Sequence, residues 1–113
     1  MAKKLPDPLS RRHLLERELP AAQALATAEA YLEEGRSIEA VEFLGKAKAS
    51  EQLTRLRAEA CAEGDAFLLR AVVRASGEAA THDEWVALAA AAEAAGKDVY
   101  AADARRQADR ETE

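Results

Sequence analysis

Few residues of this chain have side chains that could support catalysis or bind a metal, and the densest group is His82-Asp83-Glu84. Imidazole and carboxylate groups are metal ligands and proton carriers, so such a run could form a metal or acid–base site. The run follows Thr81, however, and consecutive residues of a helix point about 100° apart. Thr81 and Glu84 fit a capping box, in which each side chain binds the other's backbone N–H. We therefore predict that these residues begin a helix, where acidic groups favour the positive end of the dipole.

The other candidates for chemistry stand alone or on solvated surfaces. His13 lies in a basic turn, and Cys61, which has no histidine in its predicted helix, is expected to be a small packed thiol. A carboxylate pair would need two of Glu29, Glu33 and Glu34 to be desolvated together, and a solvated acidic edge is expected instead. The chain lacks paired histidines at metal spacing, a cysteine pair, a phosphate-binding loop and a Gly-x-Ser-x-Gly turn. We therefore expect no catalytic residue, no cofactor, no metal and no enzymatic activity.

The composition indicates a helical protein of one domain. The chain has 113 residues and a formal net charge of −5, and its 29 alanines outnumber the 21 leucines, isoleucines, valines and phenylalanines together. This alanine-weighted, charge-rich composition favours helices and argues against a β-sandwich, a β-barrel or a doubly wound sheet. A single cysteine excludes an intramolecular disulfide framework. No signal-like or membrane-spanning run is visible, so we expect a soluble, cytoplasmic protein.

Capping residues and glycines divide the chain into seven helical segments. Asp7-Pro8 predicts a short helix around residues 9–15, after which six helices of about a dozen residues follow at the helical period. Ser37 and Ser50 are predicted to cap the third and fourth helices, and Asp65, directly after Gly64, is predicted to start the fifth. The glycines that separate helices are Gly35, Gly64, Gly77 and Gly96.

Two further patterns concern burial. The segment 67–73 is apolar around most of its circumference, so we place this helix at the centre of the fold. Acidic and basic residues four positions apart mark the solvent-exposed faces. These pairs are Glu42/Lys46, Glu51/Arg55 and Glu93/Lys97.

The glycine spacing indicates repeated helix pairs. Gly35, Gly64 and Gly96 each lie between two helices and are 29 and 32 residues apart, a range typical of two-helix repeats. The first pair resembles the tetratricopeptide repeat family at Tyr31, Gly35, Ala40, Leu44 and Ala47. The third pair matches the same pattern at Trp85, Leu88, Ala89, Gly96, Ala101 and Ala108. Departures from the pattern are Gln52 in place of the proline between repeats, Leu69 in place of a small residue, and Arg105 in place of an aromatic.

The resemblance implies an all-α fold, an α-α superhelix of about three helical hairpins preceded by a short N-terminal helix. Residues 1–19 would form a basic arm with the short helix, and residues 20–110 the repeat domain. The three pairs would span about residues 20–49, 50–76 and 81–110. A HEAT-like array and an irregular helical bundle are the alternatives.

In this family the first helices of successive pairs line a concave surface that binds peptides or helices. The resemblance therefore implies a non-catalytic protein–protein interaction scaffold or adaptor. Its groove would be lined by Ala22, Leu25, Ala26, Glu29, Glu33, Thr54, Arg55, Ala58, Val86, Ala90 and Glu93. Leu25 and Glu29 stand where some family members carry a carboxylate-gripping clamp, so we expect that clamp to be absent. The acidic edges favour an apolar or mildly basic protein segment as partner.

Two alternatives to this function are kept. Exposed alanine faces and open ends would also suit a structural homo-oligomer without a separate ligand. A basic arm could instead attach the protein to nucleic acid or to a membrane surface. Its basic residues are Lys3, Lys4, Arg11, Arg12 and Arg17. Because the arm has only a small positive excess and the rest of the chain is acidic, we expect neither a nucleic-acid nor a membrane partner.

Overall fold

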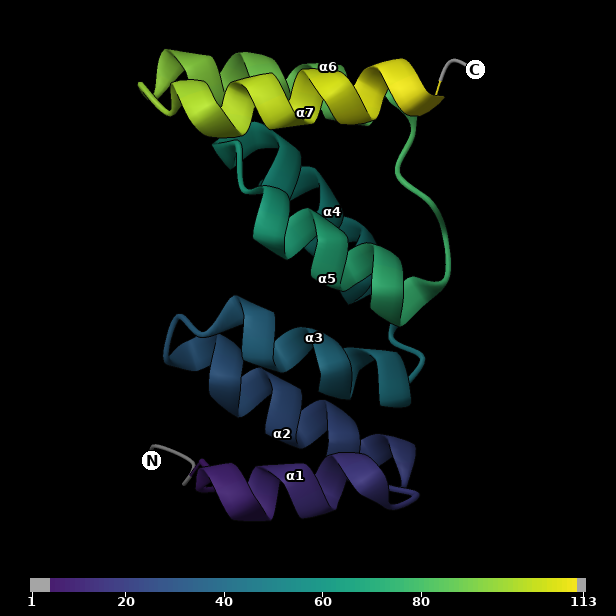
Figure 1. Ribbon diagram of the computed structural model, residues 1–113. Coiled ribbons are helices and arrows are strands. Elements are labelled where there is room, and N and C mark those ends of the chain that lie inside the picture. Colours follow the sequence, from purple (N-terminus) through teal and green to yellow (C-terminus); the bar gives the residue numbers. More distant parts are fainter. Residues whose placement is uncertain (1–4, 112–113) are drawn as a thin grey trace.

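The computed structural model describes residues 5–111, which form seven helices and no strand (Figure 1). The all-α expectation is therefore confirmed. The helices are α1 (Pro8–Glu16), α2 (Ala21–Glu33), α3 (Ser37–Lys46), α4 (Ser50–Glu63), α5 (Ala66–Ser76), α6 (His82–Ala94) and α7 (Asp98–Glu111). Within the described range, no helix is long and apolar enough to cross a membrane. Lys3 and Lys4 of the predicted basic arm lie outside the described residues.

Local signals start several of these helices as predicted. The Asp7 carboxylate accepts a 2.8 Å hydrogen bond from the Ser10 N–H, and Pro8 occupies the first turn of α1. Asp65 caps α5 in the same way, through the Leu68 N–H at 3.0 Å. These side chains satisfy backbone donors that a helix leaves unpaired at its start.

The predicted capping serines are wrong by one residue. Ser37 and Ser50 are the first helical residues of α3 and α4, and the capping positions are held by Arg36 and Ala49, which make no side-chain cap. The backbone N–H of each capping residue instead donates to a carbonyl of the preceding helix, Arg36 to Tyr31 at 2.9 Å and Ala49 to Leu44 at 3.0 Å. Each turn is therefore so short that one residue both closes one helix and opens the next.

The helices are arranged as a row of three antiparallel pairs, with α1 at one end. The pairs are α2 with α3, α4 with α5, and α6 with α7. Neighbouring pairs are joined mainly through α3 and α5 at the first junction and through α4 and α6 at the second. The radius of gyration is 15.1 Å and the extents are 39 × 28 × 24 Å. A compact chain of this length would have a radius of roughly 13 Å, so the row is open and elongated.

The core is built from a few large side chains set among alanines. Tyr31 and Phe43 stack with their ring centroids 5.8 Å apart, and Leu44, Leu69 and Leu88 are fully buried. Many of the remaining core residues are alanines on facing helices, whose small side chains let helix axes approach closely. No charged or polar residue among those described is fully buried.

The helix that was predicted to lie at the centre of the fold is α5. Leu68, Leu69 and Val72 are buried against α3 and α4, which does place α5 in the middle of the row. Phe67, however, is 59% exposed. One side of α5 is therefore apolar and open to solvent.

Gly64 permits the closest approach between two pairs. It ends α4 in the left-handed conformation, with φ +71°, and a Cβ added there would lie 2.6 Å from the backbone nitrogen of Ala92. Only glycine satisfies both the torsion and the contact. This residue therefore fixes how tightly α4 packs against α6.

Candidate functional site

The predicted cluster His82-Asp83-Glu84 begins α6 and does not converge on a common point. Thr81 and Glu84 form the predicted capping box, with the Thr81 N–H donating to Glu84 Oε1 at 2.9 Å and the Glu84 N–H to Thr81 Oγ1 at 3.1 Å. His82 lies 2.9 Å from the Ala108 carbonyl through Nδ1, so its ring links the start of α6 to the end of α7. No group of three histidine, cysteine or acidic side chains in residues 5–111 could hold a metal ion.

Arg57 and Glu84 form an ion pair with two hydrogen bonds between two helix pairs. The guanidinium donates from Nε to Glu84 Oε2 at 2.5 Å and from Nη2 to Glu84 Oε1 at 2.8 Å. The same side chain donates to the carbonyls of Glu78 at 3.0 Å and Ala79 at 2.7 Å, in the segment that connects α5 to α6. These hydrogen bonds from Arg57 hold the pKa of the Glu84 carboxyl below its usual value. The pair therefore joins α4, α6 and the connecting segment.

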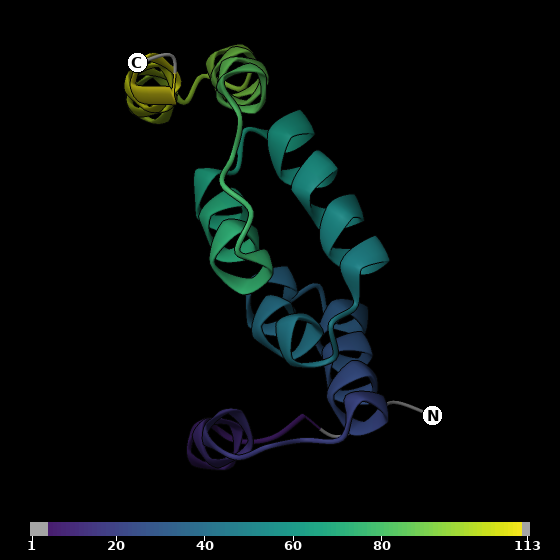
Figure 2. The ribbon, with the colours of Figure 1, turned by 90° about the vertical axis from the view of Figure 1, so that its right-hand side faces the viewer.

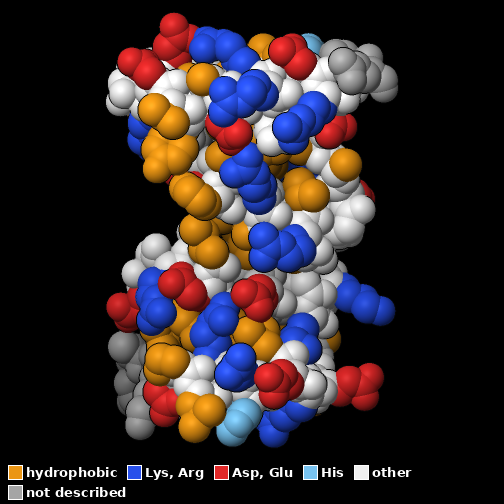
Figure 3. Space-filling view, viewed as in Figure 1, with side chains coloured by type: hydrophobic (Ala, Val, Ile, Leu, Met, Phe, Trp, Pro, Cys, Tyr) orange, Lys and Arg blue, Asp and Glu red, His pale blue; other side chains and the backbone are white. Residues whose placement is uncertain are grey.

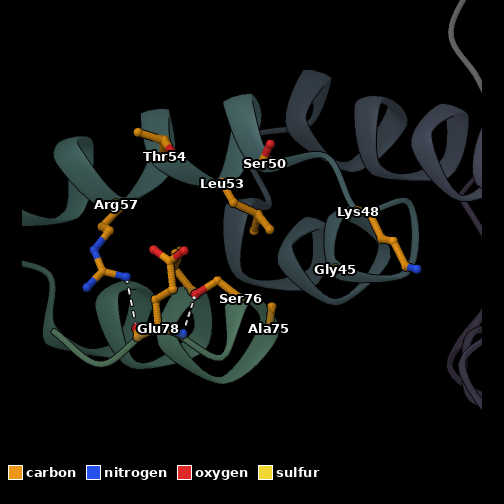
Figure 4. A pocket seen from close by; sticks show the side chains of 10 residues that line it. Gly45, Lys48, Ser50, Leu53, Thr54, Arg57, Ala75, Ser76 and Glu78 are labelled. Carbon is orange, nitrogen blue, oxygen red and sulfur yellow. Dashed lines mark hydrogen bonds between the residues drawn. The ribbon is translucent and has the colours of Figure 1, made fainter.

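A cleft of about 220 Å³ lies beside Arg57, between α4, α5 and the end of α3 (Figure 4). It is lined by Gly45, Lys48, Ser50, Leu53, Thr54, Arg57, Val72, Ala75, Ser76 and Glu78. Arg57 faces Glu78 across one end, whereas Lys48 lies beyond Gly45 at the other. The Ser76 hydroxyl accepts the Glu78 N–H at 3.2 Å. The residues that line this cleft include hydroxyls and no histidine, and Arg57 is hydrogen-bonded to the connecting segment.

Cys61 is half-buried on α4 and packs against the core, as expected for a structural thiol. Burial raises the pKa of the thiol, which lowers the fraction of reactive thiolate at neutral pH.

The structure places the eleven predicted groove residues on α2, α4 and α6. All are exposed except Leu25, which is half-buried. Glu93 forms an ion pair with Arg105 of α7. In Figure 2 these three helices lie on one side of the row, and the outline is hollowed on the other side, where α1, α5 and α7 lie. The predicted groove residues therefore lie on the side opposite the hollow, and their role as a groove stays a prediction.

The hollowed side contains a cleft of about 630 Å³ between α1, α3 and α5. We call it the α1/α3/α5 cleft; it is lined by Leu15, Ile38, Glu42, Gly45, Lys46, Phe67, Ala71, Arg74 and Ala75. Hydrophobic side chains are gathered around the waist of this face (Figure 3). Ile38 is 46% exposed and Phe67 is 59% exposed. Large apolar side chains that are exposed next to one another in a recess are typical of an interaction surface.

The two sides of the row also differ in charge. Helices α2, α4 and α6 carry eight acidic residues and two arginines, whereas α1, α3, α5 and α7 carry seven acidic and eight basic residues. The net negative charge of the protein is therefore concentrated on the side of α2, α4 and α6, and the hollowed side is close to neutral. This asymmetry favours different partners for the two sides.

Sequence reasoning missed the α1/α3/α5 cleft because it assigned the residues of its floor to the core. Ile38 is in the apolar stripe of α3, and Phe67 belongs to a helix that is apolar nearly all round. Periodicity shows that such residues need partners, but it does not show which side of a helix its neighbours leave uncovered. The excess of apolar residues on α5 was the available signal.

Searches against protein-family models, curated proteins and solved structures found no match to this chain.

Proposed function

We propose that this protein is a non-catalytic interaction module that binds a peptide or a helix of another protein. The observation that carries the proposal is the recessed α1/α3/α5 cleft, where Ile38 and Phe67 present apolar surface to solvent. Recessed apolar surfaces between helices commonly receive the apolar face of another helix. The side chains capable of acid–base or nucleophilic chemistry are dispersed or committed to helix caps, which supports a function without catalysis.

The proposal includes a structural relationship to tetratricopeptide repeats for the individual helix pairs. Tyr31 is fully buried against Phe43, and Ala40, Leu44 and Ala47 lie on α3 or at its end, in the order that the family pattern expects. The first two pairs meet mainly through α3 and α5, and the last two mainly through α4 and α6. A regular superhelix instead repeats the same kind of junction between all neighbouring pairs. We therefore propose that each helix pair is related to a tetratricopeptide repeat, and we do not extend the proposal to the way in which successive pairs are stacked.

A homo-oligomer is the second candidate function, and one observation favours it. On α7, at the end of the row, Val99 is 78% exposed. Open ends of helical arrays are capped by polar surface or by another chain. A cytoplasmic location belongs to the same proposal, and cell fractionation tests it.

Photo-crosslinking in the native cell tests the function. A photoreactive phenylalanine analogue replaces Phe67 in the cleft, Val86 on the opposite side, or Glu51 at the start of α4 as an exposed control. Binding of another protein predicts a discrete crosslinked product of higher mass at position 67 or 86 and not at 51. Products that contain only this chain support the oligomer, and the same background at all three positions contradicts both candidates.

A further inference from the structure

The lining of the α1/α3/α5 cleft includes two basic side chains. Lys46 and Arg74 both line it, and the Lys46 ammonium donates to the carbonyl of Arg17 at 3.1 Å. Within the described part of the chain, no carboxylate is paired with Arg17, Lys46 or Arg74. An acidic protein therefore has two positive charges without a paired carboxylate beside its exposed apolar recess.

The acidic residue of this cleft, Glu42, does not neutralise both Lys46 and Arg74. The Glu42 Oε1 atom lies 3.6 Å from Nη2 of Arg11 in α1. The same Nη2 also donates to the Glu39 carbonyl at 3.1 Å. The negative charge of Glu42 is therefore partly balanced by Arg11, which does not line the cleft. α5 contributes no acidic residue at all. The net field at the edge formed by Lys46 and Arg74 is positive, which favours carboxylates on whatever occupies the recess.

The floor of the recess has the form of a groove between two helices. A Cβ added at Gly45 would meet the Ala75 Cβ at 3.1 Å, so α3 and α5 lie close together along the floor. Ile38 of α3, Phe67 of α5 and Leu15 of α1 all line this recess. Such a surface accepts a row of apolar side chains spaced at i, i+3, i+4 and i+7.

We propose that the α1/α3/α5 cleft binds an amphipathic helical segment of another protein, with an apolar stripe in the recess and carboxylates facing Lys46 and Arg74. This inference rests on the proposed function and specifies its partner. It differs from the prediction for the side of α2, α4 and α6, whose acidic edges favour a basic segment. The ends of the row, α1 and α7, project on either side of the recess (Figure 2), so a flat lipid surface would meet them first.

The first test uses two matched synthetic peptides and the isotope-labelled full-length protein. Both peptides are 18-residue amphipathic helices with leucine at i, i+3, i+4 and i+7, and the remaining positions carry glutamate in one and lysine in the other. NMR titration to millimolar peptide detects weak binding. The expected result is shifts centred on Ile38, Phe67 and Ala71, with the acidic peptide binding at least fivefold more tightly. Equal or tighter binding of the basic peptide, shifts centred on α2, α4 and α6, or no shifts at all would overturn the inference.

The second test uses matched variants of the two sides. Phe67→Ser and Arg74→Glu are expected to weaken binding of the acidic peptide at least tenfold, and Val86→Ser and Arg55→Glu, on the opposite side, less than twofold. Because all four positions are exposed, thermal unfolding should remain within a few degrees of the parent protein, which separates loss of binding from loss of fold. Equal effects of the two sets would contradict the assigned site.

Other occupants of the cleft give distinguishable results. Concentration-dependent shifts at Ile38 and Phe67 without peptide would identify a second copy, and cosedimentation with phosphatidylserine vesicles that depends on Phe67 and Arg74 would identify a membrane. Either result overturns this inference. The crosslinking experiment decides the general function independently: a partner captured at position 86 alone retains the interaction module and removes this cleft as its site.

Discussion

Arg57 of α4 and Glu84 of α6 are 27 residues apart in the chain and joined by two hydrogen bonds, of 2.5 and 2.8 Å. Both side chains are mostly buried, at 14% and 24% exposed. Glu84 also caps its own helix, and Arg57 also holds two carbonyls of the segment between α5 and α6. One pair of side chains therefore fixes a helix start, a connection and the junction between two helix pairs.

Removal of the guanidinium is expected to destabilise the protein. Arg57→Met leaves the Glu84 carboxylate and the two carbonyls without their donor, which should cost about 2–3 kcal/mol in the free energy of unfolding. Urea unfolding at neutral pH measures the loss. Arg55→Met, at an exposed site two positions before in the same helix, is the control and should stay within about 0.5 kcal/mol. Equal losses in the two variants would show that Arg57 has no special role.

Stability is expected to fall on acidification through two carboxyls. Hydrogen bonds from Arg57 and Arg70 lower the pKa values of Glu84 and Asp103, respectively, in the folded protein. The unfolded chain then takes up these protons first, so the stabilisation is present above the unfolded pKa values, about 4, and is lost as the pH falls through the lower folded values.

Urea midpoints from pH 6 down to pH 3 measure this dependence. Glu84→Gln should be less stable than the parent at pH 6, and its midpoint should decline less steeply with acidification. A variant with an unchanged slope would show that Glu84 does not contribute to the dependence.

Gly64 and Gly35 allow a direct comparison of strain and contact. Both have nearly the same left-handed torsion, φ +71° and +72°, but only Gly64 has backbone of another helix within reach of a Cβ. Gly35→Ala should cost about 1 kcal/mol for the torsion alone. Gly64→Ala adds the collision with Ala92, so about 3 kcal/mol is expected. Thermal unfolding compares the two, and equal costs would mean that the approach of α4 to α6 relaxes freely.

One substitution should make the protein more stable. The Tyr31 hydroxyl is buried and has no hydrogen-bond partner among residues 5–111, although the ring itself packs against Phe43 and the guanidinium of Arg36. Tyr31→Phe keeps the ring and removes the unpaired group, so a gain of about 1 kcal/mol is expected. Tyr100→Phe, on a half-exposed ring, should change little and is the control. A loss of stability in Tyr31→Phe would reveal a partner for the hydroxyl in solution.

Features determined within a few residues could be predicted from the sequence. The helix starts at Asp7, Asp65 and Thr81 depend on a side chain and a backbone N–H three positions away, and the structure has all three. The shift at Ser37 arose because the neighbouring turn is shared between two helices. A capping residue that also closes the preceding helix depends on the residues of both helices. A sequence pattern predicts the end of one helix and the start of the next separately.

Pairings between helices could not be predicted in the same way. Glu93 was expected to face Lys97 but binds Arg105, and Lys46 was expected to face Glu42 but binds the carbonyl of Arg17. Neighbours four apart on one helix gain only a few tenths of a kcal/mol, so a partner from an adjacent helix readily replaces them. The open cleft beside Phe67 was missed for a related reason, since it depends on where α1 stops covering α3 and α5.

The alternation of junctions sets a rule for how such a chain could grow. The first junction joins the second helices of two pairs, α3 and α5, and the next joins the first helices, α4 and α6. Duplication of a single pair would place two like junctions in succession, an order of junctions that this protein does not have. The smallest insertion that keeps the alternation of the two junctions is two adjacent pairs copied together. A longer descendant of this gene would therefore be expected to gain four helices at a time.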